Sequence, residues 1–184
     1  MPVEPAPVAI ILTGGTGARL GGTDKAALEI AGSTLLERAL TATACCSSVV
    51  VVGGQTPTSR VVRFTRESPV LGGPAAGLLA GLEAVEGSPE WVVVLAVDMP
   101  YVTSGTVSRL LAAAARDGAW LIGPDGRRAL AGVLASSALR RVDPGPAARH
   151  GLPFFRLLRD LDLVAVPASS DEVHDVDNWA DVPQ

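Results

Sequence analysis

Glycines and two basic residues gather in one short stretch near the N-terminus, and residues of these types suit the binding of phosphate. The stretch is Ile10–Ala26, IILTGGTGARLGGTDKA, and it begins inside an apolar run. Its first three glycines would let backbone amides approach an anion closely. Arg19 offers a planar fork to phosphate oxygens, and Lys25 offers a point charge. The sequence therefore predicts a phosphate-binding loop, with a plain glycine-rich turn as the alternative.

This stretch matches neither of the two common glycine-rich phosphate motifs. The dinucleotide-binding motif needs Gly or Ala where this chain has Leu20. The P-loop motif fails because Asp24 stands between the glycines and Lys25, and because Ala26 replaces the Ser or Thr that would bind magnesium. The stretch alone leaves the kind of loop open.

An aspartate follows the apolar run Trp91–Val97 directly, in the sequence Asp98-Met99-Pro100. A carboxylate at the carboxyl end of a buried strand lies where a hard cation that bridges phosphates would be held. Asp98 is therefore a candidate metal ligand, although an acid in this position is commonly a helix cap or a turn residue.

A second glycine-containing segment, Leu71–Leu78, follows Glu67 and reads LGGPAAGL. A flat base or ribose could lie against the backbone at Gly73, which carries no side chain. A tight turn from loop to helix would need the same residues, so both interpretations stay open.

Two carboxylates, Asp175 and Asp177, lie close to the end of the sequence. We expect at most one of them to face a given metal ion, and the other could cap a last short helix. Asp177 is the weaker candidate for a metal contact beside Asp98.

Strands and helices that could position these residues alternate along the chain. The apolar, β-branched runs are continuous, which is typical of strands covered on both faces in a parallel sheet. Strands are predicted over 8–12, 49–52, 61–65, 91–97, 119–122, 130–134 and 163–166. Helices are predicted over 35–43 with a capping box of Thr34 and Glu37, over 75–84 after Pro74, from Thr103 or Ser104 to about 117, and more weakly over 136–142, 153–160 and 178–182.

This alternation predicts an α/β fold, a three-layer α/β/α sandwich around a mostly parallel sheet. A length of 184 residues fits a single domain over 1–184. Ligands of such sheets bind outside the carboxyl ends of the strands. The loops after Leu12, Val52 and Val97 should therefore form the functional edge.

Composition excludes several kinds of partner. The net charge is −4 and the pI is near 5.1, so we expect neither nucleic acid nor an anionic membrane as a main partner. The start, MPVEPAPVAI, holds an acid and three prolines, and we expect a cytoplasmic protein. Cys45 and Cys46 are adjacent and predict two small buried thiols, while His150 and His174 fall in no metal-ligand pattern.

Four motifs in order resemble the molybdenum cofactor guanylyltransferase family of nucleotidyltransferases. The family signature L-A-G-G-x-S-x-R-M-G-x-D-K is similar to Leu12–Lys25, which carries Gly22-Thr23 before Asp24-Lys25. The other motifs are Gly72-Gly73-Pro74-x-x-Gly77, Asp98-Met99-Pro100-Tyr101 and Asp175-Val176-Asp177. The resemblance covers nearly the whole chain.

The resemblance implies a Rossmann-like nucleotidyltransferase fold and an enzyme that transfers GMP from GTP to molybdopterin, a phosphorylated pterin, with Mg²⁺ and release of pyrophosphate. It implies that Arg19 and Lys25 neutralise phosphate charge and that Asp98 holds the metal, with Asp177 as a second contact. Transient contacts with proteins that donate or accept the cofactor are also implied. The nucleotide-binding set would be Leu12, Thr13, Gly14, Gly15, Lys25, Gly53, Glu67, Gly73 and Asp98.

The chain departs from the family pattern at several positions. Thr13 replaces the usual Ala, Gly17 the usual Ser, and Gly53 the frequent Asn, and Arg127–Leu130 replaces a frequent His-Pro-Leu element. The alternatives are a cytidylyltransferase for the same pterin, a sugar-phosphate nucleotidyltransferase, and a nucleotide-binding protein without turnover. Asp24 favours guanine, because the cytidyl relatives tend to carry Pro before the lysine.

Overall fold

The computed structural model describes residues 6–14, 24–68 and 70–176. Its central sheet has the strand order β5-β4-β1-β6-β8. The first four strands in this order are parallel, and β8 is antiparallel to β6. The bounds are β1 (Val8–Leu12), β4 (Ser48–Val52), β5 (Arg63–Thr65), β6 (Trp91–Ala96) and β8 (Arg128–Ala135). The predicted mostly parallel sheet is confirmed.

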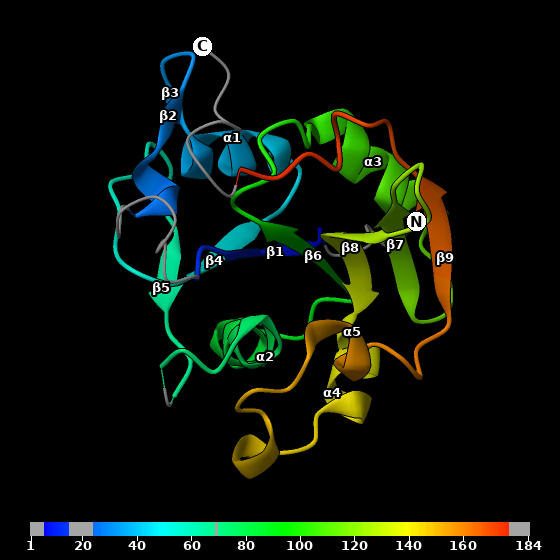
Figure 1. The fold of residues 1–184 in the computed structure, drawn as a ribbon. Helices are drawn as coiled ribbons and strands as arrows, with labels where there is room; N and C mark the ends of the chain where they lie inside the picture. The colour runs from blue at the N-terminus through cyan, green and yellow to red at the C-terminus, as the bar shows by residue number, and fades with distance from the viewer. Residues whose placement is uncertain (1–5, 15–23, 69, 177–184) are drawn as a thin grey trace.

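A second pair of strands lies beside β8. Strand β7 (Gly118–Ile122) pairs in parallel with β9 (Leu163–Pro167). A tight turn joins β7 to β8, since the Gly123 amide donates to the Arg127 carbonyl at 2.8 Å. At the other end of the two strands the Ala135 amide donates to the Asp117 carbonyl at 3.0 Å. Figure 1 shows β7 and β9 continuing the sheet beyond β8.

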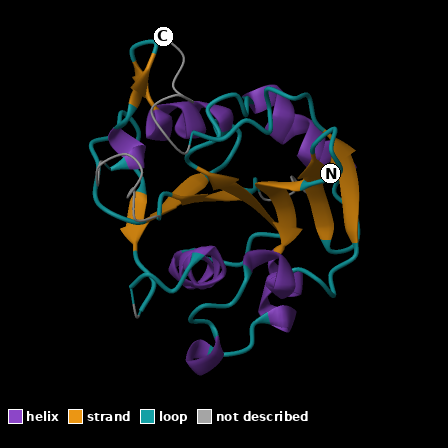
Figure 2. Ribbon diagram, in the orientation of Figure 1, coloured by secondary structure: helices purple, strands orange, loops and turns teal. Residues whose placement is uncertain are grey.

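Helices cover both faces of the sheet, which gives the predicted three layers (Figures 1 and 2). Helices α1 (Leu35–Ala42) and α3 (Ser104–Ala113) pack on one face. The other face carries α2 (Pro74–Ala84), α4 (Ser136–Val142) and α5 (Phe154–Leu157). Smaller elements are the 3₁₀ helices η2 (Lys25–Ala27) and η3 (Pro146–Ala148) and the hairpin of β2 (Glu29–Ile30) and β3 (Ser33–Thr34).

Alternation along β1 explains why its apolar run is continuous. Ala9 and Ile11 belong to the core beneath α1 and α3, whereas Ile10 and Leu12 belong to the core around α2. Successive side chains of a strand point to opposite faces, so a strand between two helical layers needs apolar residues at every position.

The helix starts were predicted well, with one exception. The Thr34 hydroxyl caps α1 by accepting the Glu37 amide at 3.1 Å. The Glu37 carboxylate does not return to the cap, because it accepts hydrogen bonds from the amide and hydroxyl of Ser59 at 2.7 and 2.6 Å. The predicted capping box is therefore half formed, and its acid instead ties α1 to the loop after β4. Thr103 caps α3 in a reciprocal pair with Thr106.

Two helices end earlier than predicted. Helix α3 stops at Ala113, because the chain then turns through Arg116, whose φ is +53°, to enter β7 at Gly118. Helix α5 stops at Leu157, where Leu158 has left the helical conformation. The helix expected over 178–182 lies outside the described residues.

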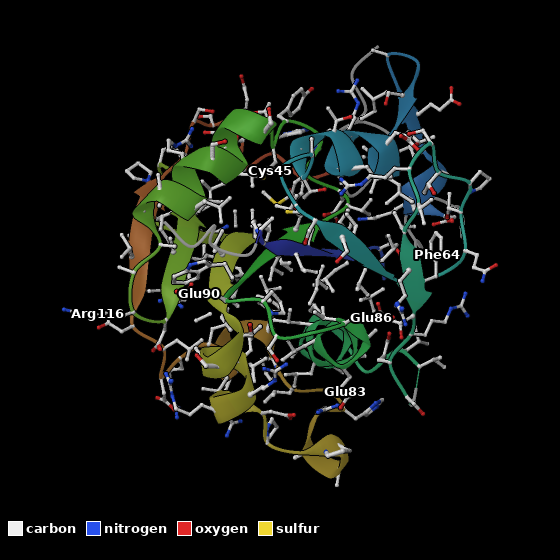
Figure 3. The ribbon with its side chains drawn as sticks, turned by 180° about the vertical axis from the view of Figure 1, so that it is seen from behind. Cys45, Phe64, Glu83, Glu86, Glu90 and Arg116 are labelled. Carbon is white, nitrogen blue, oxygen red and sulfur yellow. The ribbon has the colours of Figure 1, made fainter. Side chains whose placement is uncertain are left out.

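The two cysteines lie in different environments. Cys46 is buried, and burial together with the neighbouring Cys45 raises the pKa of its thiol to about 12. Cys45 is exposed in the turn after α1 (Figure 3), so the prediction of two buried thiols is wrong for this residue. In this turn Cys46 faces the core and Cys45 faces the solvent. Within the described residues, no helix is long and apolar enough to cross a membrane.

Candidate active site

The carboxyl ends of three adjacent strands lie together. In the parallel register Leu12 pairs with both Val52 and Ala96. The Thr13 amide donates to the Val52 carbonyl at 3.0 Å, and the Val97 amide donates to the Leu12 carbonyl at 2.9 Å. The loops that start at Gly14, Gly53 and Asp98 therefore leave the sheet side by side, as the strand pattern predicted.

Lys25 and Asp98 form an ion pair at this edge. The Lys25 Nζ lies 3.0 Å from the Asp98 Oδ2, although 73 residues separate them in the sequence. The side chains are only 13% and 24% exposed, so water screens the pair less than it would on an open surface. Both residues were predicted as site residues, and the structure brings them together.

Asp24 holds Lys25 in place. One of its carboxylate oxygens accepts the Ala26 amide at 3.0 Å and so caps η2, which begins at Lys25. The other oxygen accepts the Thr56 hydroxyl at 2.9 Å. Asp24 thus connects the lysine to the loop after β4, a role that the sequence pattern did not show.

A cavity of about 430 Å³ opens over the ion pair. Its described walls combine backbone at Gly14 with three cationic and three anionic side chains. The cationic residues are Lys25, Arg127 and Arg128, and the anionic residues are Asp98, Asp125 and Asp175. Such a cavity suits charged groups that arrive with a compensating ion, such as phosphates with a metal.

A second, more apolar pocket of about 240 Å³ adjoins the first. Leu12, Gly14 and Pro74 line both spaces. The glycine-containing segment at the start of α2 supplies the far wall, with Gly73 and Gly77. Glu67 also lines this pocket, and one of its carboxylate oxygens accepts the Leu71 amide at 3.0 Å. The pocket suits a flat base with polar edge groups.

Thr13 and Gly53, two departures from the family pattern, are in contact. The Thr13 hydroxyl donates to the Val52 carbonyl at 3.1 Å. A Cβ atom at Gly53 would lie 1.9 Å from the Thr13 Oγ1, and the φ of Gly53 is +154°. The threonine hydroxyl therefore occupies the space that any side chain at position 53 would need.

We predict that Gly53→Asn lowers the free energy of unfolding by about 1–3 kcal/mol, because the new side chain collides with the Thr13 hydroxyl. Thr13→Ala alone should cost about 1 kcal/mol through its lost hydrogen bond. In the double variant the collision is gone. Its loss in the free energy of unfolding should therefore be smaller than the sum of the two single losses. Urea denaturation of all four proteins checks this coupling, and strictly additive losses would contradict it.

The segment before the C-terminus carries Asp175 into the cavity. The Val176 amide donates to the Asp98 carbonyl at 2.9 Å, and the Val176 side chain is fully buried. Asp175 lines the cavity beside Asp98, whereas Asp177 lies outside the described residues. The expectation that at most one of the two carboxylates faces a metal ion stays a prediction.

Glu172 anchors this segment to α3. Its carboxylate accepts the Thr106 hydroxyl at 2.6 Å and pairs with the Arg109 guanidinium at 2.9 Å. Burial acts to raise the pKa of Glu172, but hydrogen bonds from Thr106, Ser169 and Arg109 outweigh it and hold the pKa below the ordinary value of 4.5.

A carboxylate with a lowered pKa stabilises the fold above its unfolded pKa, and the contribution is lost as pH falls through the folded pKa. Glu172→Gln should therefore be less stable than the parent near pH 7, and the difference should shrink below about pH 4.5. Urea denaturation of both proteins from pH 7 to pH 3 checks this, and a difference independent of pH would refute the role of the charge.

The donor groups at the site fit a hard divalent cation shared with phosphates. Among the described residues, no group of three or more His, Cys, Asp or Glu side chains forms a metal cluster. Magnesium is usually bound through one or two carboxylates, waters and substrate phosphates, and Asp98 and Asp175 offer that number.

Most of the predicted site residues meet around these two pockets. They are Leu12, Thr13, Gly14, Lys25, Glu67, Gly73 and Asp98. Gly53 contacts Thr13 at the rim, and Gly15, Arg19 and Asp177 lie outside the described residues. The prediction did not include Asp125, Arg128 and Phe155, which line the larger cavity. Asp125 lies in the turn before β8, Arg128 is the first residue of β8, and Phe155 lies in the short helix α5, so only the folded chain brings them to one cavity.

A Rossmann-like α/β sheet with a glycine, a lysine and an aspartate at its carboxyl edge is typical of nucleotide-binding enzymes. Residues 9–162 match the sequence profile of the MobA-like NTP transferase domain. The chain belongs to this family and is an enzyme of that class.

Individual relatives agree with this family. The chain is 36% identical to the molybdenum cofactor guanylyltransferase of Acidiphilium cryptum, over 75% of this chain and 73% of that protein. The crystal structure of Rv0371c from Mycobacterium tuberculosis is similar with a TM-score of 0.79 at 18% identity, covering 97% and 96% of the chains. A manganese complex of that protein gives a TM-score of 0.75 at 17% identity, covering 96% and 95%. The molybdopterin-guanine dinucleotide biosynthesis protein A of Archaeoglobus fulgidus gives 0.71 at 22% identity, covering 95% and 94%.

Proposed function

We propose that this enzyme transfers GMP from GTP to molybdopterin and releases pyrophosphate. The observation that carries the proposal is the Lys25–Asp98 pair in a charged cavity that adjoins an apolar pocket. A nucleoside triphosphate has the matching parts, a flat base and a chain of phosphates. Relatives named as molybdenum cofactor guanylyltransferases support the choice of acceptor.

The reaction needs no nucleophilic side chain. An oxygen of the acceptor phosphate attacks the α-phosphorus of GTP, and the bond from that phosphorus to the β-phosphate oxygen breaks, so that pyrophosphate leaves. Lys25 would stabilise the negative charge that develops on the phosphate oxygens. Asp98 would hold magnesium, which when bound neutralises phosphate charge and orients the triphosphate. The arrangement works by positioning and charge stabilisation.

The base pocket favours guanine over cytosine. Glu67 lines the apolar pocket, and a carboxylate is an acceptor of hydrogen bonds. Guanine presents two neighbouring N–H donors on its pairing edge, whereas cytosine presents one. A guanine base would therefore satisfy the carboxylate more fully.

Pyrophosphate release with each of the four nucleoside triphosphates, molybdopterin and Mg²⁺ tests the proposal. Release with GTP that requires molybdopterin supports it, and release with CTP instead would identify a cytidylyltransferase. Release only with a sugar phosphate as acceptor would identify the other transferase class. A thermal-shift measurement with each nucleotide detects binding without turnover, since selective binding stabilises the folded state.

A further inference from the structure

We propose that Arg128 binds the phosphate of the acceptor and that Phe155 packs against its ring system, so that one wall of the larger cavity selects the acceptor. The inference rests on the proposed function and identifies the half of the site that receives the second substrate. The cavity is lined at the carboxyl edge of the sheet by Lys25 and Asp98. It is also lined by Arg128 from β8 and Phe155 from α5.

The antiparallel direction of β8 is what brings Arg128 to the active edge. In the register of β6 and β8, Leu95 pairs with Ala131 and Val94 with Gly132. The start of β8 therefore lies at the carboxyl end of β6, where Asp98 follows. A parallel β8 would have placed Arg128 at the opposite edge of the sheet.

The backbone around Arg128 is held on both sides. The indole of Trp120 donates to the carbonyl of Ala129, the next residue. On the other side the Arg127 amide donates to the Asp125 carboxylate at 3.0 Å, and the Gly123 amide donates to the Arg127 carbonyl at 2.8 Å. The strand start that carries the arginine is thus positioned before any ligand binds, which lowers the cost of binding.

Among the described residues, the other two cationic side chains of the cavity form ion pairs, so Arg128 is the cation that can bind a ligand. Lys25 pairs with Asp98 at 3.0 Å, and Arg127 pairs with Asp125 at 3.5 Å. Arg128 is exposed, and over the described part of the chain its side chain forms no hydrogen bond or ion pair. A guanidinium presents a rigid fork of donors that matches phosphate oxygens in two parallel hydrogen bonds.

Phe155 offers an aromatic surface beside this cation. Its ring is perpendicular to those of Trp120 and Phe154, with centroids 6.2 and 5.3 Å away. The residue is still 38% exposed although it is a large hydrophobic side chain. A planar fused ring would cover this surface by stacking or edge contact. A phosphate beside a planar ring system is the chemistry of a phosphorylated pterin.

Arg128→Ala should raise the KM for molybdopterin about 10- to 100-fold, because a charge-assisted hydrogen bond to the phosphate is lost. The Kd for GTP, measured by calorimetry without acceptor, should change less than twofold. Arg128→Lys should recover part of the lost affinity. Phe155→Ala should raise the same KM, and Phe155→Leu should raise it less.

Arg156→Ala is the matched control, since it removes the same charge from an exposed position of α5 that does not line the larger cavity. Its KM for molybdopterin should stay within threefold of the parent value. An equal effect of Arg156→Ala would show a general loss of positive charge and overturn the inference. An unchanged KM in Arg128→Ala, or an effect on GTP alone, would also overturn it. If the parent protein does not consume GTP with molybdopterin, the proposed function itself fails, which is a distinguishable result.

Discussion

Lys25→Ala is expected to reduce turnover roughly 10²–10³-fold, as the removal of a preorganised charge partner typically does. The Lys25 Nζ lies 3.0 Å from the Asp98 carboxylate at the edge where the phosphates are proposed to bind. Its segment is fixed by the Asp24 carboxylate, which caps η2 and accepts the Thr56 hydroxyl. The charge is therefore in place before the substrate arrives, and alanine cannot replace it. The protein should still fold, with some loss of stability, because the partly buried Asp98 carboxylate loses this ion pair.

Steady-state kinetics of GMP transfer measures the loss, and thermal unfolding of the same preparation measures the fold. Lys25 is the only lysine in the sequence, so modification of side-chain amines reports on this one residue. GTP with Mg²⁺ should protect Lys25 from acetylation, as detected by mass spectrometry of the peptide. Turnover of Lys25→Ala within a few-fold of the parent would remove this residue from the chemistry.

Asp98→Asn is expected to abolish both activity and its dependence on a divalent metal. Asparagine keeps the shape of the side chain but carries no charge, and a neutral amide is a much weaker ligand for a hard cation than a carboxylate. The Lys25 ammonium also loses this ion pair in a site that is only 13% exposed at the lysine, so some loss of stability should accompany the loss of activity.

Activity as a function of Mg²⁺ concentration, with manganese as a second metal, checks this prediction. Asp125→Asn is the matched control, because Asp125 lines the same cavity but pairs with the exposed Arg127. The control should keep the metal dependence of the parent protein. An Asp98→Asn protein that is active with an ordinary metal optimum would count against Asp98 as a ligand.

Continuous apolar runs predicted the strands, because a strand between two helical layers must be apolar on both sides. Val8–Leu12 coincides with β1, and the run at Trp91–Val97 exceeds β6 by one residue. Helix starts followed from local hydrogen-bonding chemistry, such as the Thr34 cap and Pro74 in the first turn of α2. The carboxyl ends of parallel strands lie at one edge of a sheet, so the loops after Leu12 and Val97 were expected to meet there. The Lys25–Asp98 ion pair confirms this expectation.

The sequence pattern did not predict which other residues these local elements contact. Glu37 was expected to complete its own helix cap, but Ser59, 22 residues away, takes both carboxylate oxygens. In the sequence Thr13 and Gly53 are two unrelated departures from the family pattern. In the structure the Thr13 hydroxyl fills the space that a side chain at position 53 would need. Cys45 and Cys46 look alike in the sequence, and only the turn after α1 separates an exposed thiol from a buried one.

What the sequence by itself determined is the set of elements and the edge of the sheet that carries the candidate site, since burial, capping and glycine turns depend on residues close together along the chain. The direction of β8 was decided only by the tertiary structure, because the same apolar run can pair either way. The short turn from β7 and the packing of Trp120 favour the antiparallel arrangement. That choice brings Arg128 to the edge that carries Asp98, and with it the wall that we propose for the acceptor.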